Sequence, residues 1–271
     1  MATIVLIEHA LQRQTGTDYM AHLLARFWRE QGHKVYLQCG TDNPPPADLA
    51  VLHVDLTTVP QAYVEMASRY PRTINLGVTD ISKRGFRGDD VLTRDSSWPG
   101  RVIVKTNANF GGRIDQYLRD CQLKLGLAAD IADAPVLDEY PVYPTLQAVP
   151  SQYWMSPHYV VEKFTPEQDA RGNYMRVWVF LGDRERSMRY RSAADVIKSA
   201  NFIDGEPVAV PDELRAWRER LKFDFGKFDY VMHEGRCVLL DVNRTPGAPP
   251  VRMPGVVEAY RAVAAGVEGF L

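Results

Sequence analysis

Two neighbouring apolar segments near the C-terminus, 227–232 and 237–243, alternate like paired β-strands and constrain the fold more than any other feature. Side chains alternate across a strand, so each segment shows its apolar residues to one face of a sheet. The other face carries Asp229 in the first segment, and Asp241 with Asn243 in the second. A chain that forms this hairpin needs a core on one side of the sheet and a means of neutralising acids on the other.

The register of the hairpin follows from matching the apolar faces. A two-residue loop would pair Asp229 with a leucine, so the faces match only with a loop of odd length or with a bulge. With the three-residue loop 234–236, Asp229 lies opposite Asp241, and Lys227 lies opposite Asn243. Facing carboxylates repel, and a divalent cation can neutralise them. The hairpin therefore predicts a magnesium–nucleotide site, with Asp229, Asp241 and Asn243 as oxygen ligands; the alternative is an ordinary solvated strand face.

Composition narrows the class of protein. The 271 residues are 45% hydrophobic and 24% charged, which excludes a disordered chain, a collagen and a disulfide-stapled miniprotein. The net charge of −2 gives no basic footprint for nucleic acid, so a local cluster must hold any anionic ligand. The three cysteines lack metal-ligand spacing, and no apolar run approaches the roughly 18 residues of a membrane span. We expect a cytoplasmic protein with reduced thiols and no nucleic-acid or membrane partner.

The first third alternates short apolar runs with amphipathic stretches, which is the pattern of a βαβ layered sheet. We expect strands at 4–7, 35–37, 49–54 and 73–76, and helices at 19–31 and 61–68. This pattern is typical of a Rossmann-like domain, to which we assign residues 1–95, with the boundary in the polar stretch 79–100. Antiparallel signals dominate later, so the fold class is α/β with an α+β second part, residues 96–271.

A glycine loop follows the apolar strand that ends in Lys105. Its residues Asn109, Gly111 and Gly112 precede a predicted helix over 115–125. Backbone N–H groups and the positive end of a helix dipole suit phosphate, and the lysine adds a charge. The sequence has no Walker A lysine, and a Gly-Gly pair before a helix is more often an ordinary turn.

Two further strands carry candidate nucleotide contacts. In the first, 159–163, Glu162 and Lys163 precede Phe164, which could wall an adenine; Glu167 or Asp169 could accept hydrogen bonds from ribose. A surface charge pair is the alternative for Glu162 and Lys163.

In the second strand, 174–181, Arg176 shares a face with Trp178 and Phe180, which suits either phosphate binding or a cation–π contact with Trp178. Lys198 and Lys227 would complete a cationic ring opposite the acids.

Taken in order, these motifs resemble the ATP-grasp superfamily, and in particular its carboxylate-amine ligases of the D-alanyl-D-alanine ligase, glutathione synthetase and RimK types. The resemblance covers residues from about 80 to 250, with a small lobe at 100–163 and a large lobe at 164–271. It implies ATP and Mg²⁺, or Mn²⁺ in its place, with small-molecule carboxylate and amine substrates; a homodimer is left open.

The resemblance also implies roles for individual residues. The nucleotide site would comprise Lys83, Lys105, Asn109, Gly111, Gly112, Glu162, Lys163, Phe164 and Glu167; Lys227, Arg176 and Lys198 would be catalytic, stabilising the transferred phosphate and the oxyanion; and Asp229, Asp241 and Asn243 would hold the metal. Three departures stand out. Lys83 lies closer to Lys105 than is usual in the family, the long proline-rich segment between Lys105 and Glu162 implies a rearranged small lobe, and Asp241 replaces the more common Glu.

The implied reaction is phosphorylation of a carboxylate by ATP, followed by attack of an amine on the acyl phosphate. Three rivals stay open: an ATP-grasp kinase, a glycosyltransferase-like enzyme of the GT-B type, suggested by the N-terminal βα unit, and a non-catalytic nucleotide-binding module. Substrate contacts are expected from Glu8, His53, Asp55 and the loop 244–250, with Arg244 a candidate for binding a substrate carboxylate or for bracing the turn.

Overall fold

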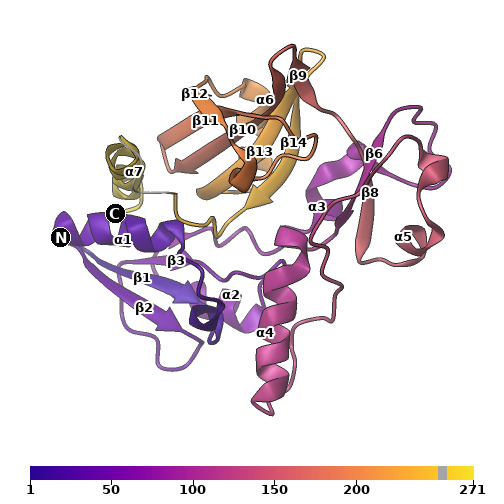
Figure 1. Ribbon diagram of the computed structural model, residues 1–271. Coiled ribbons are helices and arrows are strands. Elements are labelled where there is room, and N and C mark those ends of the chain that lie inside the picture. Colours follow the sequence, from indigo (N-terminus) through magenta and orange to yellow (C-terminus); the bar gives the residue numbers. More distant parts are fainter. Residues whose placement is uncertain (250–254) are drawn as a thin grey trace.

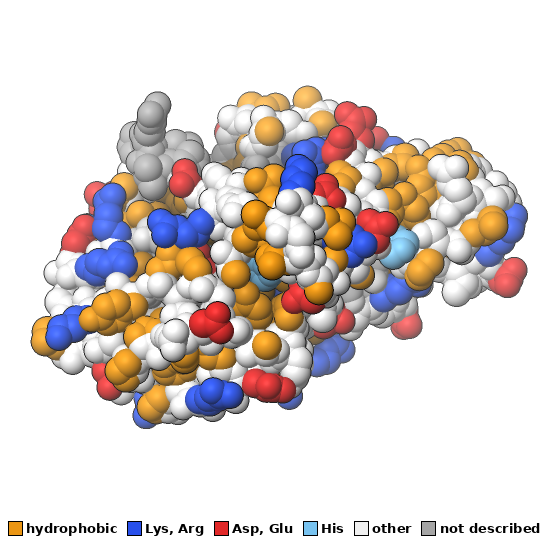
Figure 2. All heavy atoms as spheres, turned by 90° about the horizontal axis from the view of Figure 1, so that it is seen from below, with side chains coloured by type: hydrophobic (Ala, Val, Ile, Leu, Met, Phe, Trp, Pro, Cys, Tyr) orange, Lys and Arg blue, Asp and Glu red, His pale blue; other side chains and the backbone are white. Residues whose placement is uncertain are grey.

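The computed structural model describes residues 1–249 and 255–271, and the strands of these residues form three sheets (Figure 1). Pro250, the last residue of the predicted substrate loop, lies outside the described residues. Among the described residues, none of the helices has the length and apolarity required to cross a bilayer. Charged side chains of both signs are interspersed over the face shown in Figure 2.

The first sheet is parallel and is built from the N-terminal segment, as the βα alternation predicts. Its strand order is β2-β1-β3-β4, and the elements are β1 (Thr3–Glu8), α1 (Met20–Glu30), β2 (Lys34–Cys39), β3 (Leu49–Leu52), α2 (Gln61–Ala67) and β4 (Thr73–Ile74). The central strands β1 and β3 are buried on both faces, which explains why their sequences are continuous apolar runs. Glu8 lies at the carboxyl end of β1.

The second sheet is antiparallel and has the order β12-β11-β10-β13-β14, with β9 paired to β10. Its elements, with the helix that precedes β13, are β9 (Glu167–Asp169), β10 (Gly172–Leu181), β11 (Arg184–Ser192), β12 (Asp204–Pro207), α6 (Asp212–Arg220), β13 (Phe225–His233) and β14 (Arg236–Asn243). An aromatic core that includes Trp178, Phe180, Phe228 and Tyr230 fills one face. The strands expected at 174–181, 227–232 and 237–243 are therefore present.

The predicted register of the acidic hairpin is correct; of the two ways to reach it, the bulge is observed and the three-residue loop is wrong. Asp229 pairs with Asp241 and Lys227 with Asn243, while His233 pairs with Arg236 across a two-residue turn. Glu234 and Gly235 both have positive φ, 49° and 78°, as a type I′ turn requires.

A register shift after Asp229 restores the acid pairing, because Tyr230 pairs with Leu239 and leaves Leu240 as the extra residue. The bulge also changes the face of two leucines. Leu239 joins the aromatic core with Val242, whereas Leu240 lines a cavity beside the acids.

The third sheet has the order β5-β8-β6-β7 and packs around its own apolar cluster. The elements of this part of the chain are α3 (Lys83–Arg87), β5 (Val91–Leu92), β6 (Val102–Thr106), α4 (Arg113–Lys124), β7 (Val142–Tyr143), α5 (Ser151–Met155) and β8 (Tyr159–Lys163). Residues 91–92, which the predicted boundary gave to the N-terminal unit, thus belong to this sheet. The connection 107–141 between β6 and β7 contains α4, which packs on the N-terminal sheet through Leu118 and Cys121.

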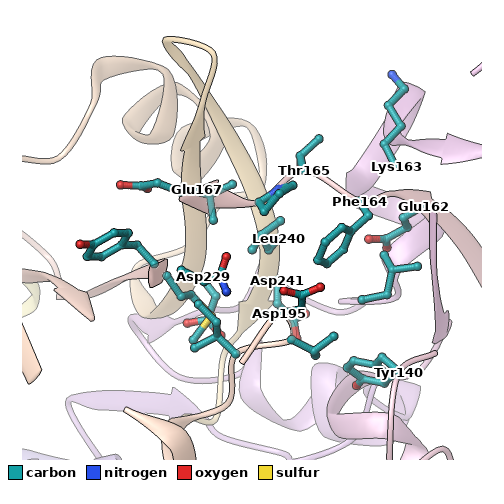
Figure 3. Close-up of a pocket in the computed structure, with 18 of the residues that line it drawn as sticks. Tyr140, Glu162, Lys163, Phe164, Thr165, Glu167, Asp195, Asp229, Leu240 and Asp241 are labelled. Carbon is teal, nitrogen blue, oxygen red and sulfur yellow. The ribbon is translucent and has the colours of Figure 1, made fainter. Parts of the chain in front are cut away.

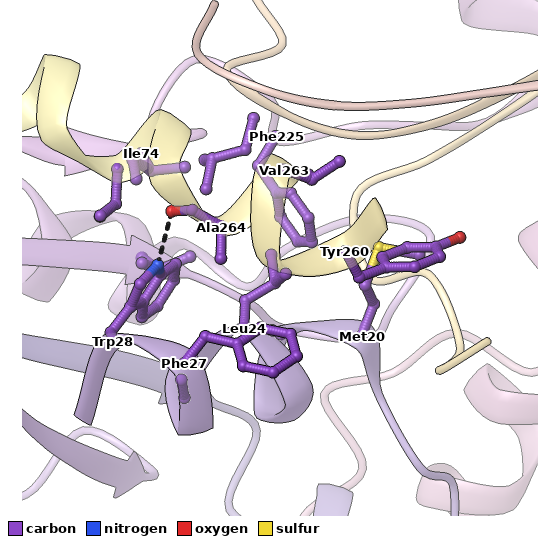
Figure 4. Close-up of a cluster of buried hydrophobic side chains, with 14 of the residues drawn as sticks. Met20, Leu24, Phe27, Trp28, Ile74, Phe225, Tyr260, Val263 and Ala264 are labelled. Carbon is purple, nitrogen blue, oxygen red and sulfur yellow. Dashed lines mark hydrogen bonds between the residues drawn. The ribbon is translucent and has the colours of Figure 1, made fainter. Parts of the chain in front are cut away.

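The C-terminal helix α7 (Val256–Ala264) returns to the N-terminal sheet and packs on α1 (Figure 4). Trp28 donates a hydrogen bond from Nε1 to the carbonyl of Ala264, 2.9 Å away, inside a core shared with Phe225 of β13. This core ties the first and second sheets together, so that the acidic hairpin is fixed relative to the carboxyl ends of β1 and β3.

Candidate functional site

A cavity lies between the third sheet and the acid-bearing face of the second (Figure 3). Its apolar wall includes Ile103, Phe164, Val231 and Leu240, and its polar wall includes Lys105, Glu162, Asp229 and Asp241. Residues 195–197 and Tyr140 complete the lining. The structure therefore gathers, around one cavity, side chains that the sequence places more than 130 residues apart.

A buried carboxylate and two buried cations form the small-lobe side of this cavity. Glu162 is fully buried; Lys105 Nζ lies 3.0 Å and Arg87 Nε 3.2 Å from its Oε2. Burial works against its ionisation, but the two cations overcome this and lower the pKa of Glu162. Burial lowers the pKa of Lys105, and Glu162 offsets part of that effect. Glu162 is thus a buried counterion that holds Lys105 in place, and it is not a surface charge.

The two acids of the hairpin each have a lysine close by. Lys227 Nζ donates to Asp229 Oδ2 over 2.8 Å, and Lys83 Nζ lies 3.7 Å from Asp241 Oδ1. Burial, with the nearby charge of Asp241, raises the pKa of Asp229, although Lys227 opposes the shift. Asp229 Oδ1 is buried and has no hydrogen-bond partner. An unpartnered carboxylate oxygen is costly to bury, so this atom is a natural point for a cation to bind.

The donor set can be tested against Mg²⁺. Asp229 Oδ1 has a free lone pair and Asp241 faces it across the ladder, so two carboxylates fit a hard cation. The predicted third ligand, Asn243, already accepts hydrogen bonds at its amide oxygen from the Thr245 amide, at 2.8 Å, and from the Thr245 hydroxyl, at 3.2 Å. No group of three or more His, Cys, Asp or Glu side chains poised to hold a metal occurs among the residues that the structure describes. The site fits Mg²⁺ that phosphate oxygens and water help to ligate.

The side chains of the segment predicted to bind adenine, 162–164, do not all point toward the cavity. Phe164 and Glu162 point toward the cavity in Figure 3, whereas Lys163 points away from it. The Lys163 ammonium lies 3.5 Å from Asp90 Oδ1 and above the Trp98 ring. Lys163 is among the residues that line the cavity, but its ammonium is bound to Asp90 and Trp98 in this structure.

Glu167 and Arg176, predicted for ribose and phosphate, are bound to each other. Arg176 Nε and Nη2 each lie 2.9 Å from a Glu167 oxygen, Arg189 Nε lies 2.7 Å away, and the Met232 amide donates over 2.8 Å. These donors lower the pKa of Glu167 despite its burial. The cation–π alternative for Arg176 on Trp178 is not observed; Arg215 and Arg218 lie over that ring instead. A ribose hydroxyl or a phosphate would have to compete for both groups.

The glycine loop precedes helix α4, as predicted, but other residues of the chain cover it. Gly111 and Gly112 have φ of 68° and 78°, and the Asn109 amide donates to Thr57 Oγ1 over 2.8 Å. A Cβ atom would lie 2.5 Å from the Leu137 carbonyl oxygen at Gly111 and 2.8 Å from the Pro135 carbonyl oxygen at Gly112. Close packing of the 107–141 connection is therefore one reason for these glycines.

Lys198 does not join the acid cluster in this structure. It is exposed, and its Nζ donates to the Asp138 carbonyl over 2.7 Å. Its neighbours 195–197 line the cavity. This segment is therefore close to the site, although the Lys198 ammonium bonds to the Asp138 carbonyl. Of the three residues predicted to be catalytic, Lys227 alone contacts the hairpin acids in the described structure.

Arg87, Arg189 and Tyr140 belong to the site but were not singled out from the sequence. Arg87 is one of several basic residues in a short polar stretch, and no spacing marks it as the partner of a glutamate 75 positions later. Alternation along 184–192 could have placed Arg189 on the face of Arg176, because Arg176 and Arg189 are directly paired.

Arg244 braces the turn and does not face a substrate. Its guanidinium is fully buried and donates to the carbonyls of Val54, Leu56 and Val78. Burial lowers its pKa to about 10. Of the two sequence interpretations of Arg244, the structural one is therefore correct.

Comparisons with known proteins identify the fold. No family model and no curated protein matches the sequence. Among solved structures, the chain is similar to the D-cycloserine synthetase DcsG, with a TM-score of 0.54 and 12% identity over 99% of this chain and 100% of that one. It is also similar to the macrocyclase MdnC from Microcystis aeruginosa MRC, bound with precursor peptide MdnA, with a TM-score of 0.51 and 9% identity over 97% and 98% of the two chains. The chain has the ATP-grasp fold that its motifs predicted.

Proposed function

We propose that this protein is an ATP-dependent ligase that joins a carboxylate to an amine through an acyl phosphate. The observation that carries the proposal is the cavity that brings a buried, unpartnered Asp229 oxygen together with Asp241 and Lys105. Lys83 and Lys227 lie beside the two acids, at 3.7 Å from Asp241 and 2.8 Å from Asp229. The two acids would hold a metal ion, and the fixed cations lie beside them. Together they could neutralise the negative charge of a triphosphate. The names of the two structural neighbours, a synthetase and a macrocyclase, agree with a bond-forming reaction.

The chain's own residues can position the reactants in this proposal. Glu162 fixes the Lys105 ammonium at 3.0 Å, so that cation is already desolvated and oriented before a phosphate arrives. Phe164 and Leu240 offer apolar surface to a base on the opposite side of the cavity. Mg²⁺, when bound, would act as a Lewis acid on the phosphate oxygens.

Lys227 is the candidate for contacting the transferred phosphoryl group. Its side chain is 29% accessible, and its ammonium lies 2.8 Å from Asp229 Oδ2. Asp229 keeps Lys227 charged, since this ion pair raises the lysine's pKa in spite of burial. A charged donor at the cavity edge would stabilise negative charge on the acyl phosphate and then on the tetrahedral adduct formed by the amine. No nucleophilic side chain is needed.

The test is phosphate release from ATP over a matrix of carboxylates and amines, with the products weighed by mass spectrometry. A ligase releases phosphate only when both partners are present, and its product has the mass of the two joined with loss of water. A stable phosphorylated acid formed without any amine would identify a kinase instead. Nucleotide-sugar binding in preference to Mg-ATP would identify the glycosyltransferase-like rival, and ATP binding without turnover on any pair would favour the non-catalytic module.

A further inference from the structure

A short stretch of the β6–β7 connection, residues 135–140, lies directly on the glycine loop; we call it the strap. The Leu137 amide donates to the Gly111 carbonyl over 3.0 Å. The carbonyls of Pro135 and Leu137 occupy the space that a Cβ would need at Gly112 and Gly111. The two backbones are therefore in contact without intervening side chains, at the loop where backbone N–H groups would meet phosphate.

Two groups that could bind an anion are engaged by the strap: Lys198, which bonds to it, and Tyr140, which is part of it. Lys198 donates from Nζ to the Asp138 carbonyl over 2.7 Å, which ties the strap to the segment 195–197 at the cavity wall. Tyr140 lines the cavity, and its hydroxyl faces the Gly111 backbone, whose Cβ position would lie 3.8 Å from it. Burial, together with the charges of Asp241 and Glu162, raises the pKa of Tyr140, and the Gly111 amide partly opposes this.

Little else secures the strap. Its residues form neither helix nor strand, and Val136, Asp138 and Glu139 are exposed. The one ion pair, between Arg113 Nη2 and Asp138 Oδ1 at 2.7 Å, joins side chains that are 49% and 67% accessible, so it contributes little stability. Segments with few buried contacts open at low free-energy cost. The strap can therefore leave while the sheets stay folded.

We propose that the strap is a latch that the nucleotide displaces: in the closed state it bonds to the Gly111 carbonyl, covers the glycine loop and holds Lys198, and phosphate binding releases all three contacts. The inference rests on the proposed function, because it needs a nucleotide in this cavity. It makes Tyr140 a residue that competes with the nucleotide, and it explains why Lys198 lies away from the acids in the closed state.

The first test uses the unmodified protein. Hydrogen–deuterium exchange is measured with and without Mg-ADP, and the latch predicts at least twofold faster exchange in peptides covering 135–140 when the nucleotide is bound, because Leu137 loses its partner. Peptides covering β3 should not change. Unchanged or slower exchange in the strap would overturn the latch, since it would mean that the nucleotide leaves the strap in place or tightens it.

The second test compares Tyr140→Phe with Tyr143→Phe, a matched control on β7 outside the cavity lining. Removing the Tyr140 hydroxyl takes its contact with the Gly111 backbone from the closed state alone, so the Kd for Mg-ADP by calorimetry should fall by about fivefold, the scale of one polar contact. Tyr143→Phe should keep the Kd within about twofold of wild type by the same scale. A higher or unchanged Kd in Tyr140→Phe overturns the latch alone. A wild-type protein that binds no Mg-ADP overturns both the latch and the proposed function.

Discussion

Two carboxylates on strands paired with β10, Glu167 on β9 and Asp229 on β13, are buried in opposite ways. Glu167 lies at the edge strand β9, and two arginines and a backbone amide occupy its oxygens. Asp229, on the neighbouring strand β13, keeps one buried oxygen without any partner beside a second acid, Asp241. A saturated carboxylate supports the fold, whereas an unsaturated one leaves room for a ligand. The difference separates residues that we expect to matter for stability from those that we expect to matter for turnover.

The largest effect is expected for Asp241→Ala. Losing one of the two facing carboxylates should lower ATP turnover by on the order of a thousandfold, because the remaining acid would hold the cation that neutralises the phosphates too weakly. Asp241 is partly exposed, so the melting temperature should stay close to that of wild type. Steady-state phosphate release and circular dichroism check both parts, with Asp183→Ala in the exposed β10–β11 turn as the control. Full activity in Asp241→Ala would show that the acid pair is not needed for ATP turnover.

Glu167→Ala should act on stability instead. It leaves Arg176 partly buried without a counterion, and Arg189 with only the more exposed Glu206 and Asp169. Breaking a buried pair typically costs about 3–5 kcal/mol in the free energy of unfolding. Asp169→Ala, which removes an exposed acid from the same strand, should lower the free energy of unfolding far less. Urea denaturation of both variants measures the difference. Equal losses would show that the arginine clamp does not support the fold.

Glu8 in the parallel sheet has one bonded and one unpartnered oxygen, and the pH dependence of stability can test its ionisation. His22 Nε2 lies 2.5 Å from one oxygen, while the other oxygen is buried without a partner. Although burial opposes it, hydrogen bonding to His22 and His53 lowers the pKa of Glu8 from 4.5 to about 2.

A depressed folded-state pKa contributes stability that is present above pH 4.5 and is lost as the pH falls toward 2. Wild type should therefore lose up to about 3 kcal/mol more than Glu8→Gln over that range, which denaturant titrations at several pH values measure. Parallel curves for the two proteins would contradict the shifted pKa.

The smallest effect is expected at the hairpin turn. Glu234 has a positive φ of 49°, which asparagine tolerates better than glutamate. Glu234→Asn should raise the free energy of unfolding by roughly 0.5 kcal/mol and leave turnover unchanged, because the turn lies at the far end of the strands from the acids. A loss of turnover would mean that the turn, and not the bulge at Leu240, sets the register of the acids.

Much of the fold was predictable because it follows from local periodicity. The strand 159–163 was predicted with its observed ends, and the parallel alternation of the N-terminal third was correct. The pairing of Asp229 with Asp241 was also predictable, since only one register matches the apolar faces. The bulge that produces it was not distinguishable from an odd loop, because both restore the same pairing.

The contacts of the site were less predictable because they join distant segments. Alternation placed Arg176 on a strand face but could not say that Glu167 neutralises it there. The glycine loop was recognisable, but nothing local indicates that residues 135–140 cover it. Arg87 acquires its role only when the folded chain brings it within 3.2 Å of Glu162 on β8.

The sequence by itself determined the strands, the facing acids and the set of cations available to an anion, because side-chain alternation and charge are properties of the chain. Tertiary structure decided which cation meets which acid: Lys105 and Arg87 on Glu162, Lys227 on Asp229, and the arginines on Glu167. The physical reason is that charge pairing depends on distance and burial, both of which are set only when the three sheets pack together.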